Sequence, residues 1–411
     1  MWFLNDSKTS ESALQLGEQI LSYQELAQQI NSAAKQLKQL PKALLILTAT
    51  WDWDFIIQFF AALSIEQPIA LFSANWSEQE QQEKIALLGS WMRITSKNEL
   101  SAHQVQEKVR YHPELALILF TSGSTGQVKA VQLSQKNILA NCQAVIHALD
   151  FKKVTSQLLF LPLSYSFGLL GQLIPGLMTG IHTVLLPQFT DIKMHFETGN
   201  IPQMWSGVPS HWVAIQRMAS VYPESAAKIK AIVSAGAPLA IALRKDLQQH
   251  FPNAVLYNNY GLTEASPRVL TYSSEDPLFW DDYAGYPVGD WQVKLSADEE
   301  LLIQGKQMML GYLGDTESPK IQAGWLATGD IAEILPTGLV AIKGRRDNQV
   351  NIAGEKVQLA EIEQKLRLVK EIKEVLVLAT EDSIYGARLF VCIEQNPTLS
   401  AISAPEMTTK I

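Results

Sequence analysis

A segment rich in glycine and hydroxyl groups at residues 121–129 has the residue types expected of a phosphate-binding loop. Glycines allow successive backbone amides to turn toward an anion, hydroxyl groups add donors, and a lysine can neutralise phosphate charge. The donors would come from Thr121, Ser122, Gly123, Ser124, Thr125 and Gly126, with Lys129 supplying the charge. An ordinary polar turn has a similar composition, so composition alone does not separate the two interpretations.

A Walker-type loop is excluded, because that motif requires a lysine directly after its last glycine. Here Gln127 follows Gly126. The segment comes after an apolar run and before an amphipathic stretch for which Ser134 is a suitable N-cap. The sequence therefore predicts a phosphate loop between a strand and a helix.

Residues 258–264, Asn-Asn-Tyr-Gly-Leu-Thr-Glu, carry side chains suited to a purine nucleotide. Tyr260 can stack on the base, and Asn258 can hydrogen-bond its exocyclic amine. Thr263 can donate to the α-phosphate, and Glu264 can hold the Mg²⁺ that accompanies ATP. Any single residue here could belong to a strand ending in a polar turn, so the prediction depends on the whole segment.

Apolar runs that alternate with amphipathic stretches predict a layered α/β protein around these residues. Strands are expected at residues 43–48, 115–121, 231–234 and 254–257, and helices at residues 134–149 and 238–250, the latter with Pro238 in its first turn. Short glycine-rich strands at residues 301–303, 311–312, 324–325 and 339–342 indicate a β-rich part. A charged turn at residues 344–347 marks a domain boundary, followed by a helix at 360–369 and a strand at 375–378.

Composition excludes several other classes of protein. The 411-residue chain has 47% hydrophobic residues and a net charge of −8, which fits a globular protein and argues against a general nucleic-acid binder. Cys142 and Cys392 provide no disulfide framework, the histidines lack zinc-ligand spacing, and the N-terminus lacks a signal-peptide pattern, so we expect a cytoplasmic protein. Prolines and polar residues interrupt the apolar region 158–187, which predicts core rather than a membrane span.

Six segments, taken in order and spacing, resemble the adenylate-forming superfamily of acyl-CoA synthetases, luciferases and peptide-synthetase adenylation domains. The phosphate loop matches that family's signature, although Val128 and Ala130 flank Lys129 where the family usually has proline and glycine. Residues 161–168 resemble the acyl-pocket segment, and residues 234–239 resemble the loop beside adenine. Residues 324–330 and 343–357 resemble the ribose-binding and hinge segments, with Asp330 and Arg345 on the ribose-binding positions.

The resemblance implies a set of site residues. Nucleotide contacts are implied for the phosphate loop and for Gly236, Ala237, Pro238, Asn258, Asn259, Tyr260, Gly261, Asp330 and Arg345. Substrate contacts are implied for Tyr165, Phe167, Gly168 and Ser234, and catalytic roles for Lys129, Thr263 and Glu264. Glu264 would also hold the metal ion.

The same resemblance implies a fold and a reaction. The fold would be α/β, with a large multi-layer N-terminal domain at residues 1–345, a β-rich subdomain at about 285–345, and a small mobile α+β lid at 346–411 that turns about Asp347. ATP and Mg²⁺ would convert a carboxylic acid to an acyl-adenylate. The acyl group would then pass to the thiol of coenzyme A or of an acyl carrier protein, with release of AMP.

The acyl-pocket segment bears on the substrate. Tyr165 and Ser166 stand where relatives that activate α-amino acids carry an aspartate, which favours a plain aliphatic or aromatic acid. Trp205, Val208, Pro209 and His211 are further candidates for the pocket, and each could equally belong to the core. The identity of the acid, the thiol acceptor and the oligomeric state stay open.

The predicted lid is short for this family. Lys410 is a candidate for the lid lysine, but it lies closer to Asp347 than that lysine usually does, and a disordered terminal lysine is the alternative. Without a lid lysine, the chain would be a nucleotide-binding relative that is inactive or depends on a partner.

Overall fold

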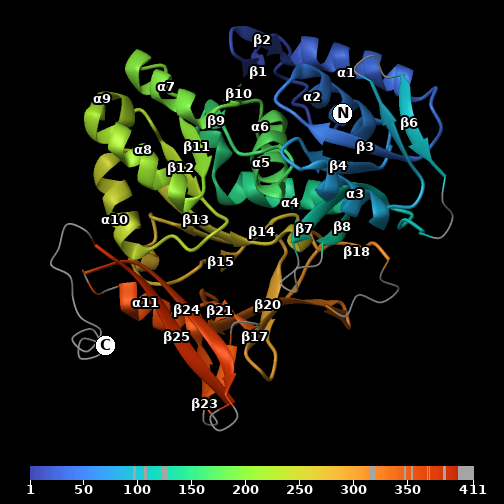
Figure 1. The fold of residues 1–411 in the computed structure, drawn as a ribbon. Helices are drawn as coiled ribbons and strands as arrows, with labels where there is room; N and C mark the ends of the chain where they lie inside the picture. The colour runs from blue at the N-terminus through green and yellow to red at the C-terminus, as the bar shows by residue number, and fades with distance from the viewer. Residues whose placement is uncertain are drawn as a thin grey trace. The chain divides into compact units, whose positions relative to one another are not determined.

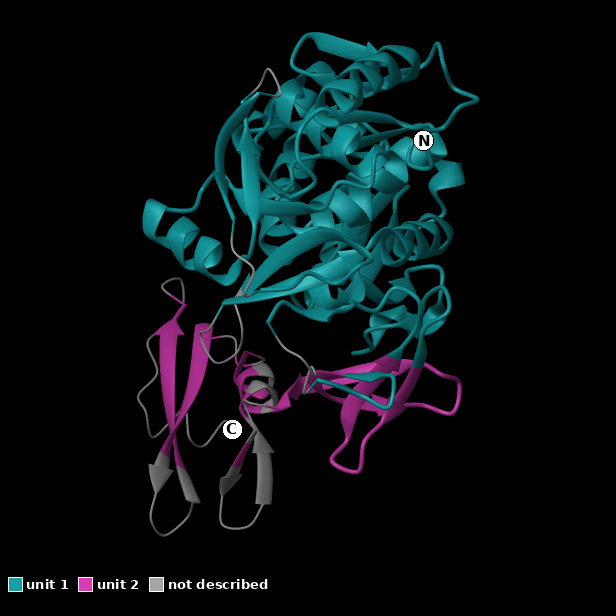
Figure 2. Cartoon of the chain, turned by 90° about the vertical axis from the view of Figure 1, so that its right-hand side faces the viewer, with its two compact units in different colours: residues 1–292, 304–326 teal, residues 293–303, 327–411 magenta. Residues whose placement is uncertain are grey.

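The computed structural model describes the chain with several gaps. The described residues are 1–95, 99–105, 109–122, 128–314, 320–346, 349–352, 355–367, 369, 371–382 and 386–396. They form two compact units (Figure 2), one containing Met1–Gln292 with Gln304–Leu326 and the other Val293–Ile303 with the chain from Ala327 onward. The boundary predicted at residue 345 lies inside the second unit and stays a prediction.

The first unit is built on two large sheets with helices packed around them (Figure 1), which confirms the predicted α/β class. One sheet, in the described part of the chain, has the order β15 (Tyr286–Pro287), β14 (Arg268–Ser273), β13 (Val255–Gly261), β12 (Ala231–Ser234), β11 (Met204–Gly207), β9 (Ser156–Leu159), β10 (His182–Leu185), β1 (Ser12–Leu16) and β2 (Gln19–Ser22). From β1 to β13 its neighbours are parallel. Their carboxyl ends therefore lie at one edge, where open α/β sheets bind ligands.

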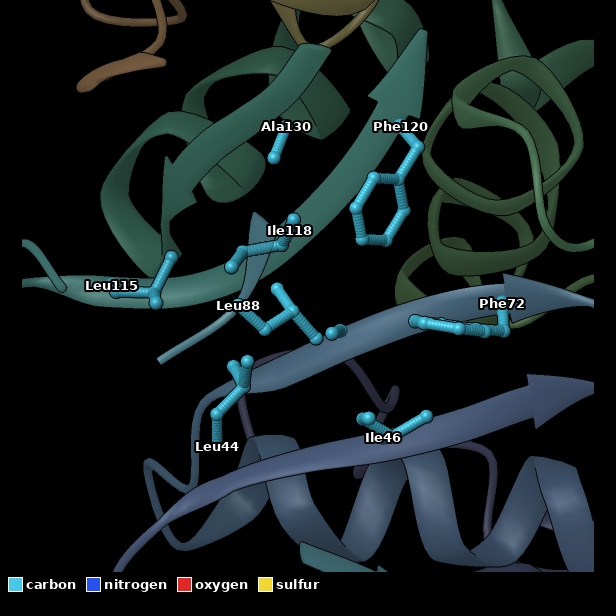
Figure 3. Packing of buried hydrophobic residues seen from close by; sticks show 9 residues of the cluster. Leu44, Ile46, Phe72, Leu88, Leu115, Ile118, Phe120 and Ala130 are labelled. Carbon is cyan, nitrogen blue, oxygen red and sulfur yellow. The ribbon is translucent and has the colours of Figure 1, made fainter. Parts of the chain in front are cut away.

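The other sheet positions the predicted phosphate loop. Its described strands run in the order β18 (Gly311–Tyr312), β8 (Val128–Ser134), β7 (Leu115–Ser122), β4 (Ile69–Ser73), β3 (Leu44–Ala49), β5 (Trp91–Ile94) and β6 (Leu100–Gln104). Figure 3 shows the buried side chains that pack on it: Leu44, Ile46, Phe72, Leu88, Leu115, Ile118, Phe120 and Ala130. The rings of Phe72 and Phe120 meet edge to face at 5.4 Å, which anchors the end of β7 just before Thr121.

Helices cover these sheets. They are α1 (Tyr23–Leu37), α2 (Trp53–Ser64), α3 (Glu78–Leu87), α4 (Gln135–Ala148), η1 (Phe151–Lys153), α5 (Ser166–Gly168), the π-helix η2 (Leu169–Leu173), α6 (Ile174–Thr179), η3 (Phe189–Asp191), α7 (Ile192–Thr198), α8 (Pro209–Val221), α9 (Pro223–Ala226), α10 (Ile241–His250), η4 (Thr263–Ala265) and η5 (Pro277–Trp280). The predicted cap is confirmed, because the Ser134 hydroxyl accepts from the backbone N–H of Asn137 at the start of α4. None of the described helices is long and apolar enough to cross a lipid bilayer.

The structure differs from two of the predictions made for these elements. The phosphate loop joins two antiparallel strands, because β8 lies between the loop and α4, and the prediction of a strand–loop–helix junction is wrong. The reason is the pattern of β8, whose residues from Ala130 to Ser134 are buried in the sheet. The helix predicted from Pro238 begins at Ile241, because the buried Arg244 donates to the carbonyl of Leu239 and holds that residue outside the helix.

The second unit has its own small core. It contains most of a sheet formed by β16 (Gln292–Leu295), β17 (Glu300–Gln304), β20 (Trp325–Ile334), β19 (Ile321–Gln322) and β21 (Val340–Arg345), followed by the hairpin β22 (Gln349–Ile352) and β23 (Glu355–Gln358), then α11 (Leu359–Arg367), and the hairpin β24 (Ile372–Asp382) and β25 (Gly386–Gln395). Leu366 of α11 packs against Ile372, Val375 and Val377 of β24. The predicted strand at 311–312 is β18, which pairs with β8 of the first unit.

We expect mutation of Arg244 to lower the stability of the protein strongly. Its guanidinium is buried and donates to the carbonyls of Leu239, Phe279, Asp281 and Tyr283. Arg244→Met would leave these groups without their donor, at a cost of about 3 kcal/mol or more. Thermal melting followed by circular dichroism should show a clearly lower midpoint, whereas Lys245→Met, at an exposed position of the same helix, should not. Equal midpoints for the two variants would contradict this role of Arg244.

Candidate nucleotide and acid site

A cavity of about 460 Å³ opens at the carboxyl ends of the parallel strands of the first unit. Its walls come from the segments that follow β9, β11, β12 and β13, as the edge rule for open α/β sheets predicts. The lining residues are Leu161, Pro162, Tyr165, Ser166, Phe167, Gly168, Val208, His211, Ala235, Gly236, Tyr260, Gly261, Leu262, Thr263, Pro267 and Arg268. A volume of this size suits a small molecule.

Two glycines of the cavity wall have no room for a side chain. A Cβ atom at Gly168 would lie 2.7 Å from the carbonyl oxygen of Pro162, and one at Gly261 would lie 1.7 Å from that of Pro267. Each close approach is between two residues that both line the cavity. The glycines predicted from sequence are therefore required by packing at this wall.

Lys129 and Glu264 lie on either side of Tyr312. The Tyr312 hydroxyl donates to Oε1 of Glu264 at 2.6 Å, and Nζ of Lys129 lies 4.8 Å from the centre of the Tyr312 ring. The Glu264 carboxylate is buried, which strengthens its electrostatic interactions. The structure thus connects the predicted phosphate-loop lysine to the predicted metal-binding glutamate through a tyrosine that sequence reasoning missed.

Backbone hydrogen bonds hold this group in place. Leu313 N–H donates to the carbonyl of Ala130, next to Lys129, at 2.8 Å. Met309 N–H donates to the carbonyl of Glu264, also at 2.8 Å. The segment from Met309 to Leu313 therefore binds both β8 and η4, and positions Lys129 and Glu264 relative to each other. Thr263, which precedes Glu264, lines the cavity.

Several predicted contact residues are held inside the protein. The side chain of Asn259 is buried, donates to the carbonyl of Ser234 at 3.0 Å and accepts from the Thr271 hydroxyl at 2.7 Å. Asn258 donates to the carbonyl of Tyr283 at 3.5 Å. Neither residue lines the cavity, nor do Thr121, Ser234, Ala237 and Pro238. Their nucleotide or substrate contacts stay predictions, and the geometry gives Asn259 a role in joining β12 to β13 and β14.

The structure distinguishes the candidate pocket residues that line the cavity from those that do not. Val208 and His211 line the cavity, and the His211 ring stacks on Phe189 with ring centres 4.7 Å apart. Burial lowers the pKa of His211 below its usual value. Trp205 is a core residue, because it is fully buried and its indole donates to the carbonyl of Pro202. Pro209 is absent from the residues that line the cavity.

Arg268 is a cavity residue that sequence reasoning missed. Its side chain is 2% exposed, and its guanidinium lies over the ring of Phe167, 5.5 Å from the ring centre. Burial lowers the pKa of Arg268 to about 9, so it remains a cation at neutral pH. The sequence does contain a signal for Arg268, because this charged residue lies directly after Pro267 and before the apolar residues Val269 and Leu270.

The predicted ribose-binding residues meet within the second unit. Asp330 of β20 and Arg345 of β21 are opposite each other in the strand register, and their side chains form an ion pair at 3.3 Å. Gly329 makes room for this arginine, since its φ is +82° and a Cβ there would lie 2.9 Å from Nη2 of Arg345. Arg346 pairs in turn with Glu300 at 2.6 Å. The two motifs that contribute Asp330 and Arg345 are thus neighbours in space.

Other predicted residues cannot be placed. Gly123, Ser124, Thr125, Gly126, Asp347 and Lys410 lie outside the described residues, and for Ser122 the structure describes the backbone strand alone. Among the described residues, no group of three or more His, Cys, Asp or Glu side chains is arranged to hold a metal ion.

Comparison with known sequences gives one family match, to the AMP-binding enzyme family over residues 88–313. The chain is similar to 4-coumarate–CoA ligase 3 of Oryza sativa subsp. japonica, with 28% identity over 314 residues, which are 70% of this chain and 56% of that protein. It is also similar to 2-succinylbenzoate–CoA ligase of Enterococcus faecalis, with 28% identity over 338 residues, 78% of this chain and 68% of that protein. The chain thus spans little more than half the length of the first of these relatives.

Solved structures that resemble this one include two that illustrate the likeness. The o-succinylbenzoate CoA synthetase of Bacillus subtilis in complex with its acyl-adenylate intermediate has a TM-score of 0.81 and 21% identity, and the match covers 98% of this chain and 89% of that one. ATP-bound MatB of Rhodopseudomonas palustris has a TM-score of 0.83 and 17% identity, with 99% and 89% covered. At these identities, the likeness concerns the fold.

Proposed function

This chain belongs to the AMP-binding enzyme family, and from that premise we propose that it is an acid–thiol ligase. It uses ATP to convert a carboxylic acid to an acyl-adenylate and then transfers the acyl group to a thiol. The observation that carries this proposal is the Lys129–Tyr312–Glu264 group, together with Thr263, which precedes Glu264 and lies in the wall of the cavity.

In the first half-reaction, a carboxylate oxygen attacks the α-phosphorus of ATP, and the bond from that phosphorus to the pyrophosphate oxygen breaks. Negative charge builds up on the phosphate oxygens, and fixed donors aimed at that charge lower the barrier. Lys129 and the Thr263 hydroxyl supply such donors in this chain. Tyr260, at the wall of the same cavity, offers a ring on which the adenine can stack.

Glu264 has the chemistry to hold Mg²⁺. This ion prefers oxygen ligands and is commonly bound by one or two carboxylates together with substrate phosphates. The Glu264 carboxylate is buried and oriented by the Tyr312 hydroxyl. A bound Mg²⁺ would neutralise phosphate charge, and the absence of a larger ligand cluster among the described residues agrees with sharing its ligands with ATP.

In the second half-reaction, a thiolate attacks the carbonyl carbon of the acyl-adenylate, and AMP leaves with the electron pair of the broken C–O bond. We propose coenzyme A as the thiol, because the relatives reported above are named as CoA ligases. An acyl carrier protein is the alternative acceptor. We further propose that Asp330 and Arg345 bind the ribose of the nucleotide, which their pairing on adjacent strands supports.

The test is pyrophosphate release from ATP in the presence of a panel of carboxylic acids. We expect release with some acids and none without acid, followed by acyl transfer when coenzyme A is added. A phosphopantetheinylated carrier protein, offered in place of coenzyme A, identifies the acceptor. Tight ATP binding without release for any acid would refute the ligase and support the alternative, a nucleotide-binding relative without catalysis.

A further inference from the structure

Arg268 is a buried cation at the wall of the cavity, and its side chain has no hydrogen-bond partner among the described residues. Its side chain is 2% exposed, and in the described part of the chain none of its Nε, Nη1 and Nη2 atoms makes a hydrogen bond. Burying an isolated charge is strongly unfavourable, so buried charges are normally paired. A charge without a partner among the described residues indicates that a bound ligand supplies one.

Arg244 shows how the same fold treats a structural arginine. Both arginines are 2% exposed, and each lies over an aromatic ring. The Arg244 guanidinium donates to four backbone carbonyls, whereas that of Arg268 donates to no group in the described part of the chain. The difference sets Arg268 apart from an arginine that holds the fold together.

The surroundings of Arg268 favour an anionic ligand. The described residues that line the cavity include no aspartate or glutamate, so none of them supplies a carboxylate to neutralise the guanidinium. Gly171 lies beside both groups, since a Cβ at that position would lie 3.2 Å from Cδ2 of Phe167 and 3.6 Å from Nη2 of Arg268. This glycine belongs to η2, and such π-helical segments occur often at functional sites.

We propose that Arg268 binds a second carboxylate on the acid substrate, so that the preferred substrates are dicarboxylic acids; this rests on the proposed ligase function. A guanidinium presents two parallel N–H donors that match a carboxylate, which makes arginine the usual partner of this group. One carboxylate of the substrate reacts with ATP, and the other pairs with Arg268. The expectation of a plain aliphatic or aromatic acid is thereby refined.

The geometry leaves room for this arrangement. The cavity of about 460 Å³ has Thr263 and Arg268 in its wall, so one small molecule can contact both. The Phe167 ring covers the guanidinium and itself lines the cavity. Phe167 therefore turns aside when the second carboxylate enters, a rotamer change of the kind common on binding.

The experiment compares acids that differ by one carboxylate. Pyrophosphate release is measured with the pairs butanoate and butanedioate, hexanoate and hexanedioate, octanoate and octanedioate, and benzoate and phthalate. For at least one pair, we expect kcat/KM to be about 100-fold or more higher for the diacid, because a buried polar group discriminates strongly against a ligand that leaves it unpaired. Equal values in every pair would overturn the proposal.

Variants then assign the preference to Arg268. Arg268→Met should lower kcat/KM for the preferred diacid by about 30-fold or more, as loss of a buried charge pair does. It should also raise kcat/KM for the matched monoacid, because the unpaired charge is gone. Arg268→Lys should keep part of the diacid preference. Arg217→Met, which removes an exposed guanidinium from α8, should leave the preference unchanged.

Other outcomes are equally decisive. If Arg268→Met lowered turnover of mono- and diacids by the same factor, Arg268 would bind the reacting carboxylate and the proposal would fail. If Arg268→Met did not fold, the wild-type comparison of matched mono- and diacids and the Arg268→Lys variant would still test the proposal. Calorimetric titration with the diacids, in the presence of a non-hydrolysable ATP analogue, tests the anion site at Arg268 separately from the ligase function. Binding that depends on Arg268 without any pyrophosphate release would refute the ligase and leave the anion site standing.

Discussion

Lys129→Ala is expected to lower kcat/KM for acid-dependent pyrophosphate release by about 10²–10³-fold, the usual effect of removing one fixed donor to a developing negative charge. The structure restrains Lys129 in a way that suits such a donor. Lys129 lies opposite Thr121 in the β7–β8 ladder, and its ammonium group lies over the Tyr312 ring. Because the strand pairing and the ring restrict this side chain, little reorganisation is needed when charge develops on the phosphate.

Two further lysine variants show whether the effect is local. Lys136→Ala removes an exposed lysine whose ion pair with Glu114 lies at the surface, and it should leave turnover unchanged. Lys129→Arg keeps the charge and should retain more activity than the alanine variant. Circular dichroism and the melting midpoint establish that each variant is folded. Turnover of Lys129→Ala within about threefold of wild type would show that the lysine is not the phosphate donor.

Local patterns were enough to predict the elements that carry the site. The strand ending at Thr121, the cap at Ser134 and the strand ending at Ser234 all have clear signals in neighbouring residues, and the structure confirms them. The strand β8 was missed because the loop was expected to lead into the helix capped by Ser134. Its partner β7 is adjacent in sequence, and the apolar residues Val128, Ala130, Val131 and Leu133 were the available evidence.

Contacts between distant segments could not be predicted in the same way. Tyr312 is 48 residues from Glu264 and reaches it because β18 pairs with β8, a register that no local pattern contains. Arg268 is different, since a charged residue directly before the apolar pair Val269 and Leu270 is visible in the sequence. Its lack of a partner is visible in the folded chain alone, since it depends on every side chain around the cavity.

Glu264→Gln is expected to lower kcat by about 10²-fold or more and to raise the Mg²⁺ concentration needed for half-maximal activity. The amide keeps the shape of the carboxylate and still offers an oxygen to the Tyr312 hydroxyl, so folding should persist. What the variant loses is the negative charge that attracts Mg²⁺. Titrating the ion at saturating ATP and acid therefore measures the proposed role directly.

Tyr312→Phe and Glu275→Gln complete this experiment. Tyr312→Phe keeps the charge of Glu264 but removes its donor, and we expect a loss of about tenfold, the value of one hydrogen bond to a charged group. Glu275 is exposed and pairs with Lys153 at 3.5 Å, so Glu275→Gln should change neither kcat nor the Mg²⁺ requirement. If Glu264→Gln lost activity with an unchanged Mg²⁺ requirement, the carboxylate would act by orienting Lys129 and Tyr312, and the metal ion would be held elsewhere.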